Sequence, residues 1–451
     1  MNKTEKTLVQ LFIPICIETL FYMLAGMIDT LMLSTINDQA VGAVGTANTY
    51  ISMFILMFSI VSTGMMAVMT QNIGAGRPGV AYQAKNIGMI FNLVLGTFLS
   101  LILFFFSGDL LRTIGISAAL EDYATTYMKI VGSAVFLNAL IPIFAGYLRA
   151  FGHTKQPLFA TITANLLNLG LNALFLFHFH WGVAGVAVAT VISRAVNLLV
   201  NIIFSMVKVR AKQSPERIAS KTVIKQILQI GLPSAFESLL YNIAMTLAIR
   251  FLNQMDASGF HVSARAYAAQ IANFSFCAGA ALAQANAIMT GWRIGRREYD
   301  ACRKGTRKAW VIGLMVSACL SCVIALISPN IIPFFTDDAS MIKIVTRLLW
   351  IDVILEFGRV TNLVYGNALK TCGDAIFPVI MGIIFMFLCA VGGTYVLGIR
   401  LDLLVTGCYI ALAGDECCRG IGMILRWKSG KWKEKGLVKE FQQSTISKEE
   451  N

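Results

Sequence analysis

Long apolar runs dominate the chain, and short polar connections separate them. The runs cover residues 11–33, 41–70, 87–107, 123–148, 158–180, 183–207, 226–252, 259–291, 309–328, 340–369, 376–397 and 403–426. A helix needs about 20 apolar residues to cross the roughly 30 Å hydrocarbon core of a bilayer. The pattern therefore predicts an all-α integral membrane protein with twelve transmembrane helices.

The composition supports a membrane protein and weakens other interpretations. Hydrophobic residues make up 57% of the chain and charged residues 14%, against about 25% charged residues in a typical soluble domain. The net charge of +13 could indicate nucleic-acid binding. The basic residues, however, lie in the connections between apolar runs, where they orient a membrane protein. We expect a lipid bilayer as partner and no nucleic acid.

The distribution of Lys and Arg predicts the topology. Basic residues gather at the amino end, after the even-numbered runs, and in the tail that follows the last run. Under the positive-inside rule, both termini of this multi-pass protein are cytoplasmic. An even number of spans places both termini on the same side of the membrane, which agrees with this arrangement. We expect the cell membrane as its location.

The sequence contains an internal duplication. Pro14, Glu18 and Tyr22 return 219 residues later as Pro233, Glu237 and Tyr241. Two further blocks repeat at offsets of 220 to 221 residues: 70–85 matches 290–305, and 147–157 matches 368–378. Each copy has an even number of spans, so both start on the same side of the membrane. The duplication predicts two parallel six-helix lobes around a central cavity.

The polar segments set the expected domain boundaries. The N-lobe, with helices 1 to 6, covers residues 1–207, and a cytoplasmic linker covers 208–225. The C-lobe, with helices 7 to 12, covers 226–427, and a polar cytoplasmic tail covers 428–451.

Asp29 is the first functional candidate because it lies inside the first apolar run. An acidic side chain at the bilayer centre costs about 2.5–3.5 kcal/mol on insertion scales. Such a residue is expected to face the interior of a helix bundle or a wet cavity.

Three amides share one helical face in the fifth run. Asn165, Asn168 and Asn172 are spaced at i, i+3 and i+7, so their side chains project in one direction. They could bond neighbouring helices. They could equally offer carbonyl oxygens to a hard cation beside Asp29, and the spacing leaves both interpretations open.

Further charged residues lie within or near apolar runs. Glu356 and Arg359 are spaced at i and i+3, so we predict that they form an ion pair. Arg194, Glu237 and Arg265 are additional candidates for a polar cavity wall. Together these groups would suit an anionic or zwitterionic cargo, or a proton relay.

Sequence motifs give no support to an enzyme. The chain has no HExxH, GxSxG or P-loop motif. We therefore expect no catalytic residues and no cofactor. Energy for active transport would have to come from an ion gradient, unless transport is passive or a partner supplies it.

The motifs together resemble the multidrug and toxic compound extrusion (MATE) family. The relevant segments are LRAFGHTKQP before the fifth span, GVAGVAVATVISR in the sixth, and ALAGDECCRG in the last. The resemblance covers the chain from about Leu11 to Arg426. It implies that Na⁺ or H⁺ binds among Asp29, Asn168, Asn172 and Thr190, and that helix 1 bends at Pro14.

The chain departs from this family pattern at Asn172, where relatives often have a second Asp. Asp29 is then the only carboxylate that the resemblance places in the site. A lone carboxylate favours a proton or a weakly held Na⁺. If the protein is sodium-coupled, its metal ligands are Asp29, Asn168 and Asn172.

The resemblance implies a monomeric secondary active transporter. It would export organic, cationic and amphipathic compounds in antiport with H⁺ or Na⁺ by alternating access. The alternative is a lipid or lipid-linked oligosaccharide flippase of the same multidrug/oligosaccharidyl-lipid/polysaccharide exporter superfamily. Such proteins tend to have a more cationic cavity, and Arg194, Arg265 and Arg359 agree with that alternative.

Overall fold

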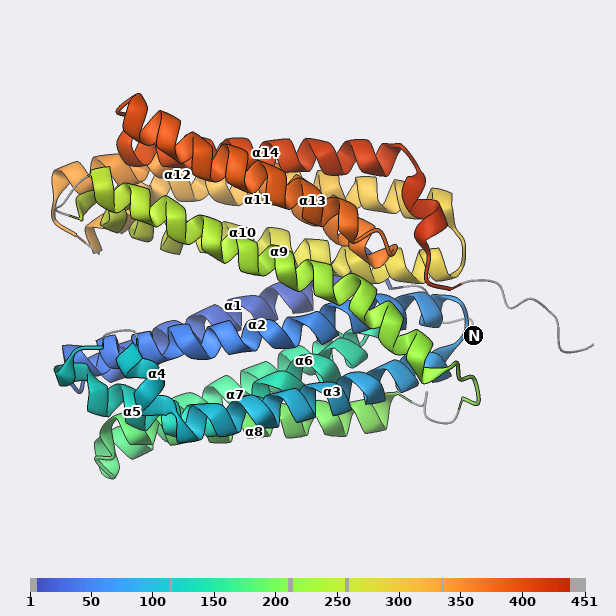
Figure 1. The fold of residues 1–451 in the computed structure, drawn as a ribbon, viewed down its shortest axis with the longest axis horizontal. Helices are drawn as coiled ribbons and strands as arrows, with labels where there is room; N and C mark the ends of the chain where they lie inside the picture. Colours follow the sequence, from blue (N-terminus) through green and yellow to red (C-terminus); the bar gives the residue numbers. More distant parts are fainter. Residues whose placement is uncertain (1–5, 114–115, 210–213, 256–258, 335, 439–451) are drawn as a thin grey trace, which may run out of the picture.

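The structure of the protein is a computed structural model. It describes residues 6–113, 116–209, 214–255, 259–334 and 336–438. The described residues form helices and no strands, as the apolar pattern predicts. The helices divide into two lobes (Figure 1).

The first copy of the repeat forms the N-lobe. Its elements are α1 (Leu8–Ser34), α2 (Asp38–Gly74), α3 (Pro78–Phe105), the short α4 (Ser107–Thr113), α5 (Ala118–Ser133), α6 (Val135–Ala150), α7 (Lys155–Ala173), η1 (Leu174–His178) and α8 (Gly182–Lys208). The expected fourth span, 123–148, is divided into α5 and α6, which meet at an angle of 44°.

The second copy forms the C-lobe. Its elements are α9 (Ser220–Met255), α10 (Phe260–Gly295), α11 (Tyr299–Ile331), η3 (Ile332–Phe334), α12 (Ala339–Thr371), α13 (Ile376–Phe385), η4 (Met386–Gly392), η5 (Thr394–Arg400) and α14 (Leu404–Lys428). Because α9 starts at Ser220, residues 220–225 of the expected linker are helical.

Most of the helices are apolar enough to span a bilayer. In the described ranges, nine helices meet this condition by length and composition, or ten if the bent pair α5 and α6 is one span. Helices α12 and α14 are also of spanning length, with 33 and 25 residues. They carry most of the buried charged residues of the C-lobe, such as Asp352 and Glu356 on α12 and Asp415 and Arg419 on α14, which makes them less apolar than the others.

The lobes approach each other at the side that carries Lys6 and Leu437, which we call the terminal side, and diverge towards the far side (Figure 1). Glycines allow this approach: a Cβ atom on Gly64 or Gly231 would overlap the backbone oxygen of Ile227 or Ile60, respectively. Gly295 lies equally close to the Gln71 carbonyl. Helix α2 therefore packs with its backbone against α9 and α10.

Hydrogen bonds join the lobes at the terminal side. Gln71 Nε2 donates to the Thr371 carbonyl at 2.6 Å, and Trp292 Nε1 donates to the Ala150 carbonyl at 2.8 Å. Gln71 lies on α2 of the N-lobe and Trp292 on α10 of the C-lobe, and each donates to the last residue of a helix in the other lobe. The terminal side is thus sealed by polar contacts as well as by close backbone packing.

The first part of the predicted polar tail, 428–451, packs against the protein after α14 and contacts both lobes. The 3₁₀ helix η6 (Lys431–Lys435) buries Trp432, whose ring stacks on Trp427 with centroids 4.2 Å apart. Further on, the backbone N–H of Leu437 donates to Gln71 Oε1 at 2.8 Å. Residues 439–451 of the predicted tail lie outside the described residues.

We expect Gly231→Leu to open the terminal side. The larger side chain must displace the α2 backbone at Ile60, and overpacking of this kind costs about 1–3 kcal/mol. Hydrogen exchange followed by mass spectrometry should show faster backbone exchange in residues 60–75. The control is Gly170→Leu on α7, where an added Cβ meets no atom within 4 Å. Equal exchange in the two variants would contradict this interpretation.

Candidate functional site

The N-lobe encloses a polar cavity of about 590 Å³, which we call the N-lobe cavity. Helices α1, α2, α5, α6, α7 and α8 all contribute to its wall. Its polar lining residues are Tyr22, Asp29, Asn48, Tyr127, Asn138, Arg149, Asn165, Asn168, Thr190, Ser193, Arg194 and Asn197. The structure thus brings Asp29, Asn168 and Thr190 from three different helices to one chamber.

Asp29 is held by the amide face of α7. Asn172 Nδ2 donates to Asp29 Oδ1 at 2.7 Å and lies 3.2 Å from Asn168 Oδ1. Asn172 is fully buried, and its own Oδ1 has no hydrogen-bond partner among the described residues. The predicted face of α7 therefore meets Asp29, although Asn165 turns to the backbone oxygen of Phe21, at 2.8 Å.

Helix α8 supplies the opposite wall of the N-lobe cavity. Thr190, Arg194 and Asn197 follow at i, i+4 and i+7, so they share one helical face. The Thr190 hydroxyl donates to the Val186 carbonyl of its own helix at 2.9 Å. Arg194 Nη1 is buried without a hydrogen-bond partner, and Arg194 forms no salt bridge with Asp29 in the described part of the chain.

The donor set of the N-lobe cavity fits a hard cation or a proton. Carboxylate, amide and hydroxyl oxygens are the ligands that such cations prefer. In the described ranges, no group of three or more His, Cys, Asp and Glu side chains could hold a metal ion. A cation here would depend on one carboxylate and on neutral oxygens, which is a weak site for Na⁺.

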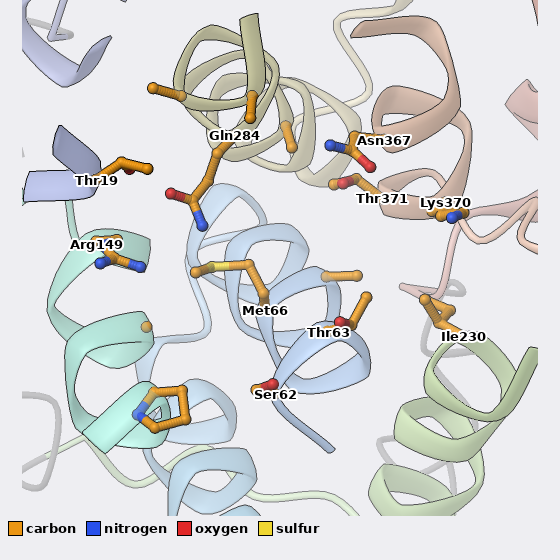
Figure 2. Close-up of a pocket in the computed structure, with 16 residues that line it drawn as sticks. Thr19, Ser62, Thr63, Met66, Arg149, Ile230, Gln284, Asn367, Lys370 and Thr371 are labelled. Carbon is orange, nitrogen blue, oxygen red and sulfur yellow. The ribbon is translucent and has the colours of Figure 1, made fainter. Parts of the chain in front are cut away.

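A second cavity lies between the lobes at the terminal side, and we call it the central cavity. It measures about 390 Å³ and is lined from both lobes (Figure 2). Its polar lining residues are Thr19, Ser62, Thr63, Arg149, Gln284, Asn367, Lys370 and Thr371. Arg149 and Pro142 line both cavities, so the two chambers share a wall.

Two ion pairs border the central cavity. Arg149 Nη2 lies 2.6 Å from Glu18 Oε1, and Lys370 Nζ lies 2.6 Å from Glu237 Oε2. The first pair joins α6 to α1, and the second joins α12 to α9. Glu237, a candidate from the sequence, therefore stands behind Lys370 and is not itself a lining residue of either cavity.

The predicted pair of Glu356 and Arg359 is confirmed, and it lies inside the C-lobe. Ser317 also donates to Glu356, with an oxygen separation of 3.0 Å. Neither Glu356 nor Arg359 is among the lining residues of the two cavities. Arg265 is likewise outside those linings, and its guanidinium lies 3.6 Å from the Met245 sulfur.

Helix α14 carries a buried cluster of charged side chains, and the predictions from the sequence did not include it. Arg419 contacts Asp415 at 2.5 Å and Glu416 at 2.9 Å. Asn362 of α12 donates to Glu416 at 3.0 Å. The i, i+3 and i+4 spacing of these charges was a usable signal for an intrahelical cluster. The polar face of α8 was also readable from its spacing.

Helix α1 continues through Pro14, which lies inside it as a buried residue. A proline within a helix removes one backbone hydrogen bond. The described α1 nevertheless extends without interruption from Leu8 to Ser34. The predicted bend at Pro14 therefore stays a prediction about another conformation.

Comparison with known proteins gives the family. The MatE family model matches residues 14–174 and again 233–396, which are the two copies of the duplication. An uncharacterized transporter, YisQ of Bacillus subtilis, is 33% identical over 94% of each chain. The probable multidrug resistance protein NorM of Thermotoga maritima is 26% identical over 96% of this chain and 94% of its own.

Solved structures share the fold. A transporter of the multidrug/oligosaccharidyl-lipid/polysaccharide exporter superfamily from Pyrococcus furiosus superposes with a TM-score of 0.85. The match covers 94% of this chain and 95% of that chain at 21% identity. This likeness agrees with the predicted two lobes of six spans each, and the matches confirm the predicted resemblance. The chain belongs to the MatE family of multidrug and toxic compound extrusion transporters.

Proposed function

We propose that this MATE transporter exports organic compounds across the cell membrane in antiport with H⁺ or Na⁺. The observation that carries the proposal is Asp29, a carboxylate inside the N-lobe cavity with an amide donor and no salt bridge in the described residues. An intramembrane acid that forms no salt bridge is a natural site for an exchangeable cation, and the Arg194 guanidinium in the same cavity wall acts on it at longer range. The proposed role of the protein is transport and not enzymatic catalysis.

The protein would exchange between two orientations, each open to one side of the membrane. Cation and cargo would be coupled because each of them shifts the populations of these orientations. A cation at Asp29 neutralises the carboxylate and favours the orientation in which the neutral group is better accommodated. Cargo binding favours the other orientation. Rocking of the N-lobe against the C-lobe then exposes the cavities alternately to the two sides. Asn168, Asn172 and Thr190 would contribute neutral oxygens to the cation.

The N-lobe cavity also supports a cargo of drug size. Ligand pockets for such molecules measure about 300–1,000 Å³, and this one measures about 590 Å³. Tyr22 and Tyr127 lie in the wall with Asp29. Aromatic faces and a carboxylate both attract an organic cation, so an amphipathic cation is the proposed cargo of a monomeric carrier.

Arg194 supports the second candidate, a lipid or lipid-linked oligosaccharide flippase. Its guanidinium lies in the wall of the N-lobe cavity with one nitrogen buried and unpartnered. Guanidinium groups suit phosphate because they offer paired donors. The export assay below separates the candidates, since a flippase would move a labelled phospholipid and no soluble dye.

The basic residues support one orientation of the protein in the membrane. Connections rich in Lys and Arg adjoin the terminal side (Figure 1): residues 214–225, which lead into α9, and residues 293–308 at the junction of α10 and α11. We therefore propose that the terminal side is cytoplasmic. The sealed terminal side then corresponds to a conformation that is closed to the cytoplasm.

We expect Asp29→Asn to abolish gradient-driven export. The amide has a similar shape but cannot take up a proton or balance a cation, so the gradient no longer biases the orientation of the lobes. Efflux of a cationic dye from proteoliposomes, under imposed H⁺ or Na⁺ gradients, should fall to the level of empty vesicles.

The control for Asp29→Asn is Asp109→Asn, which removes an exposed carboxylate on α4. This variant should export the dye like the parent protein. If export by Asp29→Asn still responds to either gradient, the coupling site lies elsewhere.

We expect Asn172→Asp to tighten Na⁺ binding. The second carboxylate would lie beside Asp29, where Asn172 Nδ2 is now 2.7 Å away. The two acids repel unless a cation lies between them, and about 1.4 kcal/mol of added attraction is a tenfold change in affinity. Thermal unfolding of the purified protein against NaCl, with choline chloride as reference, measures the effect. An unchanged sodium dependence would rule out Asn172 as a ligand position.

A further inference from the structure

Two basic residues face the central cavity from equivalent positions of the two copies. Arg149 lies in the last turn of α6, and Lys370 lies in the last turn of α12. Figure 2 shows them on opposite sides of the cavity. Each lobe therefore contributes one cation to the same chamber.

An acid from the matching position of each copy lies behind each of these cations. Glu18 holds Arg149, and Glu237 holds Lys370, both at 2.6 Å. Glu18 is 2% exposed, and neither acid is among the residues that line the central cavity. The lining consequently contains two cations and no carboxylate.

Hydrogen-bond donors remain available on both cations. Arginine has five N–H groups and lysine three, and only one contact to a carboxylate oxygen is formed by each. The amides of Gln284 and Asn367 and several hydroxyl groups complete the polar wall. Such a set is suited to an anionic group, whose oxygens accept hydrogen bonds.

The stability of the fold gives no reason for the ion pairs of Arg149 with Glu18 and of Lys370 with Glu237. Removing two charges from water costs several kcal/mol per ion, so a buried pair is often no better than an apolar pair. Charges in a membrane interior more often indicate a substrate pathway. Arg149 strengthens this interpretation because it lines both the central cavity and the N-lobe cavity.

We propose that Arg149 and Lys370 make the central cavity a binding site for the carboxylate or phosphate group of the cargo. The proposal deepens the proposed export function and rests on it for the identity of the cargo. The proposed organic cation then also carries an anionic group, so the cargo is a zwitterion whose cationic part is directed to Asp29. An anion attracted from both lobes also favours their close approach at the terminal side.

The test compares the affinities of the purified protein for two matched probes. One is a fluorescent aminoquinoline carboxylic acid, and the other is its methyl ester. Fluorescence polarisation should show at least about tenfold tighter binding of the acid, the equivalent of about 1.4 kcal/mol. Equal affinities of the parent protein for acid and ester would overturn the proposal.

The variant for this test replaces both pairs completely: Glu18→Gln with Arg149→Gln, and Glu237→Gln with Lys370→Gln. Removing whole pairs avoids an unpartnered buried charge, which would destabilise the fold. The preference for the acid should be lost in this variant. A merely structural role would lower the affinities for both probes alike, and that result would also overturn the proposal.

The matched control removes another Arg and Glu pair. Arg112 and Glu121 lie 2.6 Å apart outside both cavity linings, and Arg112 is largely exposed. Arg112→Gln with Glu121→Gln should keep the preference for the acid. Loss of the preference in this control would show that general charge, and not the central cavity, selects the acid.

A second pair of probes identifies the source of the anion. Short-chain phosphatidic acid and the corresponding diacylglycerol differ in the phosphate alone. A preference for phosphatidic acid that is stronger than that for the quinoline acid, and is lost in the variant, assigns the site to a lipid headgroup. The binding measurement uses no ion gradient. Its result therefore does not depend on whether Asp29→Asn abolishes gradient-driven export. Failure of gradient-driven export therefore overturns only the proposed function.

Discussion

The cost of charge in a hydrocarbon environment organises the polar residues of this protein. An ionised side chain inside a bilayer needs a partner or access to water. Glu18, Glu237, Glu356 and Asp415 each satisfy this requirement with a basic residue of their own lobe. Asp29 has only an amide donor, at 2.7 Å, and a polar cavity beside it. Among the residues that line the two cavities, Asp29 is the one acid, so it is the carboxylate that an incoming cation can reach there.

The duplication supplies the scaffold, while the chemistry differs between the copies. The position equivalent to Asp29 in α9 is Ala248, which is fully buried. Acids of the C-lobe instead gather on α12 and α14, where Arg359 and Arg419 neutralise them in part. By contrast, the ion pairs beside the central cavity occur in both copies. In the proposed mechanism, the coupling chemistry thus belongs to one lobe, whereas the central cavity is lined from both.

The sequence predicted local and repeated features well. The apolar runs gave the helices, the offset of 219 to 221 residues gave the two lobes, and the i, i+3 and i+7 spacing gave the amide face of α7. It did not predict the contact of Arg149 with Glu18, since 131 residues separate them and only helix packing brings them together. The contacts of Leu437 were missed for the same reason, because a polar segment shows no sign of its docking site.

The terminal side explains how small local changes could move whole lobes. Gln71 of α2 uses both ends of its amide there: Nε2 donates to Thr371 of the C-lobe, and Oε1 accepts from Leu437. Glycine contacts such as Gly231 on Ile60 bring the two backbones into direct contact. In the proposed rocking of the lobes, the hydrogen bonds and the glycine contacts would break together. Such packing resists gradual deformation and favours two discrete arrangements, which is what the proposed selection by one cation at Asp29 requires.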